Sequence, residues 1–262
     1  MGQRCDFVYI SLTRHDQTGD DRSYLEWHQL EHMAEKYQFP GITGGQRWIS
    51  TSACRAARSV EVDEWATVAH VTSYLMGEPI EETLDDFMGV GRPKINANPA
   101  GMAGAPSLPT HFQAPMKVVE TYIGPGIYLP PQTLPFRPNR GVYFVVEEPT
   151  GETGWDEYLR QVHPAVVREL LDVPGVAGAW VLASTPLLRK RERFYSPGDY
   201  LMTVYYLDDD PADVGRRLVE PLQRSWKGQP TTPLLGAPFE SMMRLDWESF
   251  GPGKDEPRTP SM

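Results

Sequence analysis

The stretch YLEWHQLEHMAEKYQFPGITGGQRWIS, residues 24–50, has the pattern of a helix, a Pro-Gly turn and a strand. The stretch WDEYLRQVHPAVVRELLDVPGVAGAWVLAS, residues 155–184, follows the same order later in the chain. In each copy a glutamate precedes a histidine by six positions, Glu26 and His32 in the first and Glu157 and His163 in the second. Self-similarity at this scale predicts that the chain carries two copies of one structural unit.

The segments around these two stretches also match. An apolar run precedes each helix, at residues 6–12 and 141–148, and a β-branched and aromatic run follows at residues 65–76 and 200–207. A helical run comes next, at residues 78–91 and 210–226, and Asp210 or Asp213 suits the N-cap of the second one. A last strand is expected at residues 116–123 and 239–247. Each half is therefore predicted to be β-α-β-β-α-β.

This order predicts an α+β protein of two tandem ferredoxin-like units. Two right-handed βαβ crossovers give a four-stranded antiparallel sheet with both helices on one face. The bare face must be buried, and the sheet of the other copy is the simplest partner, which makes an intramolecular α/β-barrel pseudo-dimer. We expect units at residues 1–123 and 140–250, a Pro-rich linker at 124–139 and a disordered tail at 251–262.

Composition excludes several classes of function. The net charge is −10, which disfavours nucleic acid and anionic membrane as partners because both need a basic face. No uninterrupted apolar run reaches the roughly 18 residues of a transmembrane helix, and the N-terminus lacks the pattern of a signal peptide. Cys5 and Cys54 have no metal-binding spacing. We therefore expect a cytoplasmic protein, which could associate further as a homo-oligomer of pseudo-dimers.

The helix at residues 24–32, the Pro40-Gly41 turn and the strand at 45–49 resemble the dimeric α/β-barrel superfamily, in particular its EthD-like and polyketide-cyclase-like branches. Members of that superfamily include cofactor-free monooxygenases, lactone isomerases, cyclases and haem enzymes such as chlorite dismutase. The resemblance implies the architecture and a small aromatic, polyketide-like or lactone substrate. Val162 stands where an acidic residue precedes the histidine in the first half, which indicates that the second half is structural.

The string His28-Gln29-Leu30-Glu31-His32 fits the H-x-x-E-H pattern of one group of zinc proteases. Two imidazoles at this spacing can chelate zinc, but a third ligand is needed, and the family pattern explains the same residues without metal. We therefore expect no metal. An imidazole exchanges protons near neutral pH, so His32 is an acid/base candidate. The alternative is that His32 only packs the end of its helix.

Strand alternation separates two faces of the first sheet. One face carries Phe7 and Tyr9 from the first strand, and His70 and Tyr74 from the third. We predict that this polar and aromatic face is the bare one and lines the pocket. The aliphatic face, with Val8, Ile10, Leu12 and Val71, would then lie under the helices. Arg47 and Trp48 take opposite faces of the second strand, and Arg47 could bind a carboxylate or enolate.

The sequence therefore predicts a cofactor-independent enzyme that moves protons on an aromatic, polyketide-like or lactone substrate by isomerisation, cyclisation, elimination or oxygenation. The predicted catalytic residues are His32, His70 and Tyr9, and the predicted substrate-binding residues are Phe7, Tyr24, Trp27, His28, Arg47 and Tyr74. Two alternatives stay open. One is a non-catalytic small-molecule binding protein, and the other is a haem enzyme of the chlorite-dismutase type, although the haem-edge motif of that group is absent from the sequence.

Overall fold

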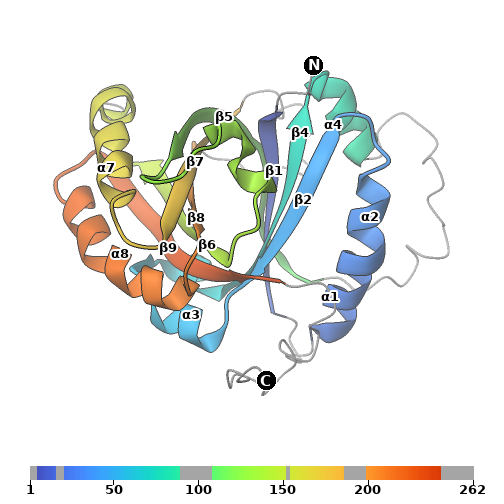
Figure 1. Cartoon of the computed structure of the whole chain (residues 1–262), viewed down its shortest axis with the longest axis horizontal. Helices are drawn as coiled ribbons and strands as arrows, with labels where there is room; N and C mark the ends of the chain where they lie inside the picture. Colours follow the sequence, from blue (N-terminus) through green and yellow to red (C-terminus); the bar gives the residue numbers. More distant parts are fainter. Residues whose placement is uncertain (1–4, 16–20, 89–107, 152–153, 186–198, 243–262) are drawn as a thin grey trace.

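The computed structural model describes residues 5–15, 21–88, 108–151, 154–185 and 199–242. Its centre is a closed barrel of eight antiparallel strands (Figure 1). Around the barrel the strands follow the order β2, β4, β1, β5, β7, β8, β6 and β9, and pairing of β9 with β2 closes the ring. A short strand, β3 (Val60–Glu61), adds to β9. The strand bounds are β1 Cys5–Arg14, β2 Ile42–Ile49, β4 Val68–Gly77, β5 Thr110–Ile123, β6 Gly141–Pro149, β7 Val176–Ser184, β8 Leu201–Leu207 and β9 Thr231–Ser241.

Both halves of the barrel have the same strand order. In the first half the order β2-β4-β1-β5 places the second, third, first and fourth long strands side by side, and β7-β8-β6-β9 does the same in the second half. The expected α+β fold with antiparallel sheets is confirmed. Because each sheet supplies half of the ring, the two inner faces cover one another, as the bare face of a ferredoxin-like sheet requires.

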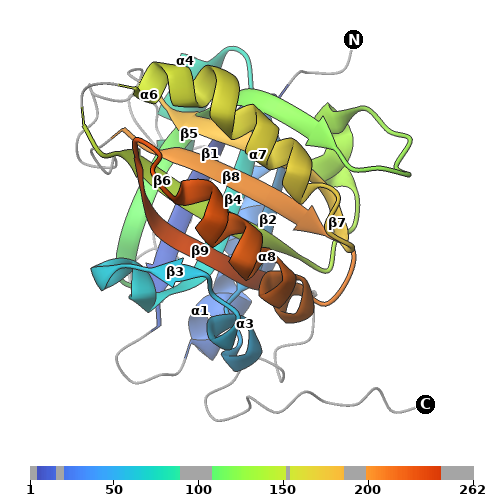
Figure 2. The same cartoon turned by 90° about the vertical axis from the view of Figure 1, so that its left-hand side faces the viewer.

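The helices lie on the outside of the barrel, as Figures 1 and 2 show from two sides. The first half carries one continuous helix, formed by α1 (Arg22–Trp27), the π-helical turn η1 (His28–His32) and α2 (Met33–Lys36), together with α4 (Ile80–Met88). The second half carries α6 (Trp155–Glu157), the π-helical turn η4 (Tyr158–Val162) and α7 (His163–Leu170), together with α8 (Pro211–Trp226). As expected, Asp210 caps α8, because its side chain accepts a hydrogen bond from the Asp213 amide.

Four short elements were not predicted from the sequence, namely strand β3 and three short helical elements. Helix α3 (Ser52–Ala56) follows β2, the 3₁₀ turn η2 (Asp63–Thr67) precedes β4, and the 3₁₀ turn η3 (Pro131–Phe136) lies in the Pro-rich linker. Several strand bounds also differ from expectation, and the largest differences are that β5 starts at Thr110 rather than 116 and β9 at Thr231 rather than 239. Residues 243–247 of the predicted last strand lie outside the described residues. The expected tail, residues 251–262, lies outside the described residues.

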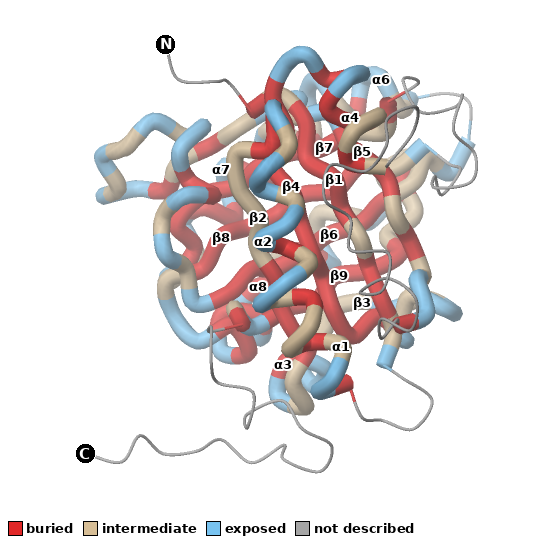
Figure 3. Tube along the Cα trace, turned by 90° about the vertical axis from the view of Figure 1, so that its right-hand side faces the viewer, coloured by how far each residue is buried: buried red, intermediate tan, exposed pale blue. Residues whose placement is uncertain are grey.

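The barrel interior is aliphatic and aromatic, and residues from both halves share one cluster there. Val8, Ile10 and Leu12 of β1 and Val71 of β4 point into it, with Trp48. Figure 3 shows the strands as the buried part of the first half, with exposed positions concentrated on the outer helices. The interior therefore adds apolar contacts between the two sheets to the strand pairing of β5 with β7 and of β9 with β2. Burial of this apolar surface is the main favourable term in the association of the sheets.

The two faces of the first sheet are therefore the reverse of the prediction. Phe7, Tyr9 and Tyr74 lie on the outer face, packed against the helices with Met33 and Phe87. Alternation separates two faces but does not say which one turns inward. The inner face is the aliphatic one because residues from both sheets pack there without water, whereas residues under amphipathic helices can reach polar partners near the edge.

In the described part of the chain no helix has the length and apolar character needed to cross a membrane.

Candidate functional site

The helix formed by α1, η1 and α2 lies along the outer face of β2 and β4 (Figure 1). Side chains from the helix and the two strands meet in one group, which we call the histidine cluster. Its members are Tyr24, His28, His32, Arg47, His70 and Tyr74. All six were singled out from the sequence, and the fold brings them together.

Close approach of the helix to β2 depends on Gly45. A Cβ built at Gly45 would lie 2.9 Å from the Met33 Cε and 3.1 Å from the ring of Tyr74. Because this glycine has no side chain, the helix can sit directly on the strand. Arg47, two residues further along β2, therefore faces the same side as Gly45 and lies beneath the helix, where its guanidinium stacks 5.0 Å from the centroid of the Tyr24 ring.

His28 and His70 are buried, His32 is half-buried, and the rings of His28 and His32 contact one another. His28 is 6% exposed, its Nε2 lies 3.3 Å from the Tyr74 hydroxyl, and its ring centroid lies 5.0 Å from that of His32. Burial, followed by the positive charges of Arg47 and its neighbours, holds the pKa of His28 well below the ordinary value of 6.5. Burial likewise lowers the pKa of His32 to about 3 and that of His70 to about 4. At neutral pH these imidazoles are uncharged and can accept a proton.

Several buried polar atoms of the cluster have no partner among the described residues. They are Nδ1 of His28, His32 and His70, and Nε and Nη1 of Arg47. An unsatisfied buried polar group costs about 1–3 kcal/mol, and native structures contain few of them. These atoms leave the cluster with hydrogen-bonding groups that a bound molecule can use.

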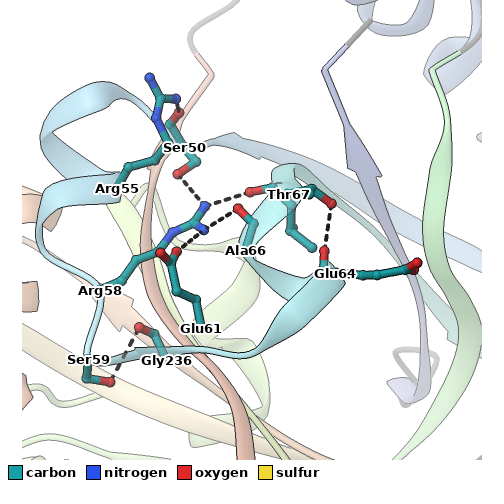
Figure 4. A network of polar contacts seen from close by, with 10 residues as sticks. Ser50, Arg55, Arg58, Ser59, Glu61, Glu64, Ala66, Thr67 and Gly236 are labelled. Atoms are coloured by element: carbon teal, nitrogen blue, oxygen red, sulfur yellow. Dashed lines mark hydrogen bonds and ion pairs between the residues drawn. The ribbon is translucent and has the colours of Figure 1, made fainter. Parts of the chain in front are cut away.

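Arg47 differs sharply from Arg58, a second buried arginine on the same half. Arg58 bonds Ser50, Glu61 and the carbonyls of Ala66 and Val68, as Figure 4 shows for its surroundings. Arg47 is 3% exposed and donates one bond, to the Tyr24 hydroxyl at 3.3 Å. Within the described ranges no carboxylate lies within ion-pair distance of Arg47. Four protein oxygens thus hold the guanidinium of Arg58, whereas the guanidinium of Arg47 keeps N–H groups that can bind an anion.

The other predicted residues line the apolar side of this site. Phe7 and Tyr9 belong to the core beneath α2 and α4, and the Tyr9 ring lies 4.8 Å from that of Phe87. Trp27 stacks on His32 with centroids 4.8 Å apart, at the half-buried surface of the helix. Tyr9 is almost fully buried, which raises the pKa of its hydroxyl, so it stays protonated.

Asp21 is the main residue that sequence reasoning missed. It directly precedes α1 and is 2% exposed, and its Oδ2 lies 2.7 Å from the Nε2 of His70. His15 contacts the same oxygen. An acidic residue at the start of a helix is usually a cap, so its position in the sequence carried no signal for a contact with a strand 49 residues away.

The matching place in the second half holds different chemistry. His28 and Tyr158 each begin a π-helical turn, so these two residues correspond, and the predicted match of His32 with His163 is off by one position. Strand register gives the other corresponding residues. Arg47 lies opposite Thr72 in the first half and Val181 lies opposite Thr203 in the second, so Val181 corresponds to Arg47. By the same register His70 corresponds to Leu201. The second half therefore lacks the cation and this imidazole.

The polar groups of the second half instead satisfy one another. The buried Glu147 accepts hydrogen bonds from Tyr158 at 2.7 Å and Thr231 at 3.1 Å, and His163 contacts Thr203 at 3.0 Å. Burial raises the pKa of Glu147 above its usual 4.5. A cavity of about 400 Å³ lies beside this network and is lined by Gly154, Glu157, Tyr158, Val162, Gly228, Gln229 and Pro230.

Comparison with known proteins shows the fold. A crystal structure titled as an anthrone oxidase-like protein covers 91% of this chain and 92% of its own, with a TM-score of 0.52 and 14% identity. A second structure, assigned provisionally as a chlorite dismutase, covers 94% and 97% with a TM-score of 0.50 and 10% identity. No family model and no curated protein matches the sequence. The protein therefore has the ferredoxin-like dimeric α/β-barrel fold.

The haem implied by the chlorite-dismutase resemblance does not fit the residues of the second half. An axial histidine needs a free ring nitrogen facing open space. The Nε2 of His163 is engaged by Thr203, lies 3.9 Å from a carboxylate oxygen of Glu147, and belongs to a residue that is 4% exposed. A hydroxyl and a buried carboxylate thus engage the ring nitrogen that an axial ligand would need.

Proposed function

We propose that the first half of the chain binds a small aromatic ketone and moves a proton between its carbon and oxygen atoms without a cofactor. The unpartnered buried atoms of the histidine cluster carry this proposal, because they combine one fixed positive charge with neutral bases. A molecule that becomes an enolate or phenolate supplies the anion that Arg47 lacks and the proton that the imidazoles accept. The family resemblance and the anthrone oxidase-like neighbour support this class of substrate.

In the proposed reaction the carbonyl oxygen of the substrate lies against the free Nε and Nη1 of Arg47. An imidazole, His32 or His70, takes a proton from the adjacent carbon, and the electron pair of the broken C–H bond moves onto the oxygen. The negative charge on oxygen is stabilised by Arg47, and the imidazolium returns its proton to another atom in an isomerisation. In an oxygenation the carbon of the same enolate would form a bond to dissolved O₂, the oxidant, and take up a proton to give a hydroperoxide. Loss of water from this hydroperoxide would leave a second carbonyl group at that carbon.

The remaining residues would shape the substrate site. Trp27 and Tyr24 provide aromatic faces for stacking, and Phe7 forms part of the apolar floor. We assign His28 and Tyr74 to substrate orientation through their mutual hydrogen bond at 3.3 Å. Tyr9 stays in the proposal as a group that polarises the carbonyl, because burial keeps its hydroxyl protonated and able to donate a hydrogen bond.

We also propose that the two halves arose by tandem duplication, with units at residues 1–123 and 140–250 joined by the linker at 124–139. Identical strand order and two π-helical turns at matching places support this. After duplication the first unit would have kept the catalytic groups, while the second replaced them with Tyr158, Val181 and Leu201.

Anaerobic hydrogen–deuterium exchange at the methylene of 9-anthrone, followed by NMR in D₂O, tests the proposal. We expect the wild type to accelerate exchange over buffer and Arg47→Met to reduce that acceleration roughly 100-fold, the usual effect of removing one oxyanion-stabilising group. Arg55→Met, at the exposed Arg55, is the control and should keep the wild-type rate. Admission of air should then convert the anthrone to anthraquinone faster with enzyme than without.

Exchange at the buffer rate with the wild type, together with tight binding of anthrone, would assign the chain to the non-catalytic binding proteins instead. Wild-type exchange in Arg47→Met would remove Arg47 from the mechanism.

A further inference from the structure

Asp21 and His70 form a buried pair that joins the start of helix α1 to strand β4. The Asp21 Oδ2 lies 2.7 Å from the His70 Nε2, and the two residues are 2% and 1% exposed. The Nδ1 of His15, on a half-exposed side chain, contacts the same oxygen. One carboxylate oxygen therefore serves two imidazoles.

The carboxylate of Asp21 does not perform the role that its position in the chain favours. Asp21 is the N-cap residue of α1, yet its side chain makes no capping hydrogen bond. Asp210, at the equivalent place before α8, accepts a bond from the Asp213 amide. A side-chain cap is worth about 1 kcal/mol, so α1 forgoes that stabilisation while the carboxylate reaches His70.

This contact determines which nitrogen of His70 carries its proton. An ionised carboxylate only accepts hydrogen bonds, so His70 must donate from Nε2. A neutral imidazole has one N–H, and the lone pair is therefore on Nδ1. That Nδ1 is buried and has no partner among the described residues. Arg47 and His28 are close enough to His70 to interact with it electrostatically.

We propose that Asp21 is a positioning residue that holds His70 as the Nε2–H tautomer, so that Nδ1 of His70 is the base that faces the substrate. This inference rests on the proposed function for the identity of the proton donor. It adds two assignments to that function: Nδ1 of His70 is the base, and the carboxylate of Asp21, which no sequence pattern indicated, positions it. The arrangement follows the logic of a catalytic triad, in which a carboxylate orients an imidazole and stabilises the imidazolium.

The proton transfer is balanced within the pair and the substrate. His70 Nδ1 accepts the proton released from carbon, and the ring becomes an imidazolium with N–H on both nitrogens. The electron pair stays on the substrate as an enolate held by Arg47. The Nε2–H remains on Asp21, whose negative charge stabilises the imidazolium, and the Nδ1 proton is later returned to the product.

The tautomer is measured directly by ¹H–¹⁵N correlation NMR on the full chain labelled with ¹⁵N-histidine, without substrate. Loss of signals in His70→Gln assigns the His70 ring. We expect a protonated Nε2 and an unprotonated Nδ1 in the wild type at pH 7. In Asp21→Asn, whose amide can donate as well as accept, we expect the Nδ1–H form to appear. Asp210→Asn, which alters a helix cap far from the cluster, should leave the His70 signals unchanged. The ring signals of His163 serve as an internal reference in every spectrum.

Activity supplies the second measurement. Asp21→Asn should slow exchange of anthrone roughly a hundred- to a thousand-fold with little change in anthrone affinity, and Asp21→Glu should recover part of the rate. A protonated Nδ1 on His70 in the wild type overturns the inference even if Asp21→Asn does not fold. Stoichiometric binding of added Zn²⁺ that is lost in Asp21→Asn and His15→Ala also overturns the inference, because it would make His15, Asp21 and His70 metal ligands. Failure of the wild type to turn over anthrone would contradict the proposed function, but it would not affect the measured tautomer of His70.

Discussion

The two halves of the barrel share one strand order and differ in what lies between the sheet and its helices. In the first half this layer holds Arg47, His28 and His70 with unpartnered atoms. In the second half the corresponding positions hold Val181, Tyr158 and Leu201. All three side chains lie in an apolar cluster, and the hydroxyl of Tyr158 donates a hydrogen bond to Glu147. The fold therefore does not need these polar groups, and their unpartnered buried atoms cost stability in the first half, which agrees with the binding site proposed there.

The largest effect is expected when the buried arginine of the first half is introduced at the corresponding position of the second half. Val181→Arg places a cation among Leu170, Leu218 and other apolar side chains, where Val181 is 2% exposed. The variant should lose about 3–5 kcal/mol of unfolding free energy, measured by chemical denaturation. Val181→Met, which adds length without charge, should lose at most about 2 kcal/mol. Equal losses in both variants would mean that this layer tolerates charge in either half.

Two buried arginines of the first half should respond in opposite ways. Arg58→Met breaks bonds to Ser50, Glu61 and the carbonyls of Ala66 and Val68, and should cost about 3 kcal/mol of unfolding free energy. Arg47→Met removes an unpaired charge and should leave the ligand-free protein as stable or about 1–2 kcal/mol more stable. Thermal and urea unfolding of both variants measure this contrast. A large loss of stability in Arg47→Met would show that Arg47 holds the fold together.

Acid should destabilise the first half more than the second. A histidine whose pKa is lower in the folded protein than in the unfolded chain gives its full stability above the unfolded pKa of 6.5 and loses it as the pH falls toward the folded pKa. For His32 that window runs from 6.5 to about 3, and for His163 from 6.5 to about 4. His28 and His70 behave in the same direction.

The measurement is the slope of unfolding free energy against pH between 6.5 and 4. Each single His→Gln variant should remove about one proton from that slope, or up to about 1.4 kcal/mol per pH unit. His28, His32 and His70 together should therefore account for more of the acid loss than His163. A wild-type slope that His→Gln variants of the first half leave unchanged would mean that their imidazoles are not held neutral.

The smallest effect is expected where the linker meets the barrel. The indole of Trp48 donates to the Asn139 Oδ1 at 3.1 Å, whereas the indole of Trp180 donates to the Pro131 carbonyl at 2.9 Å. Asn139→Ala leaves the Trp48 N–H and the Ser241 hydroxyl without their acceptor and should cost about 1–2 kcal/mol of unfolding free energy. Asn139→Asp keeps an acceptor and should cost less. An Asn139→Ala variant as stable as the wild type would show that the linker contact with the first half is dispensable.

Much of the candidate site could be anticipated from residue types. Histidines at positions 28 and 32 lie on one helix face by spacing alone, and Arg47 and His70 were visible as polar residues in apolar strands. The sequence did not predict where these residues come together, because that depends on which face of the sheet turns outward. The prediction placed Tyr9 and Tyr74 on the inner face and Val8 and Ile10 outside, and the structure has the opposite arrangement.

The amino-acid sequence by itself determined the repeated element order, the antiparallel α+β class and the cap of helix α8, since these follow from local periodicity and from turn and cap residues. Only the tertiary structure decided the orientation of the sheets, the correspondence of His28 with Tyr158, and the pairing of Asp21 with His70. Those outcomes depend on contacts between residues far apart in the chain. Their free energy comes from packing two whole sheets and their helices together, and no single segment contains it.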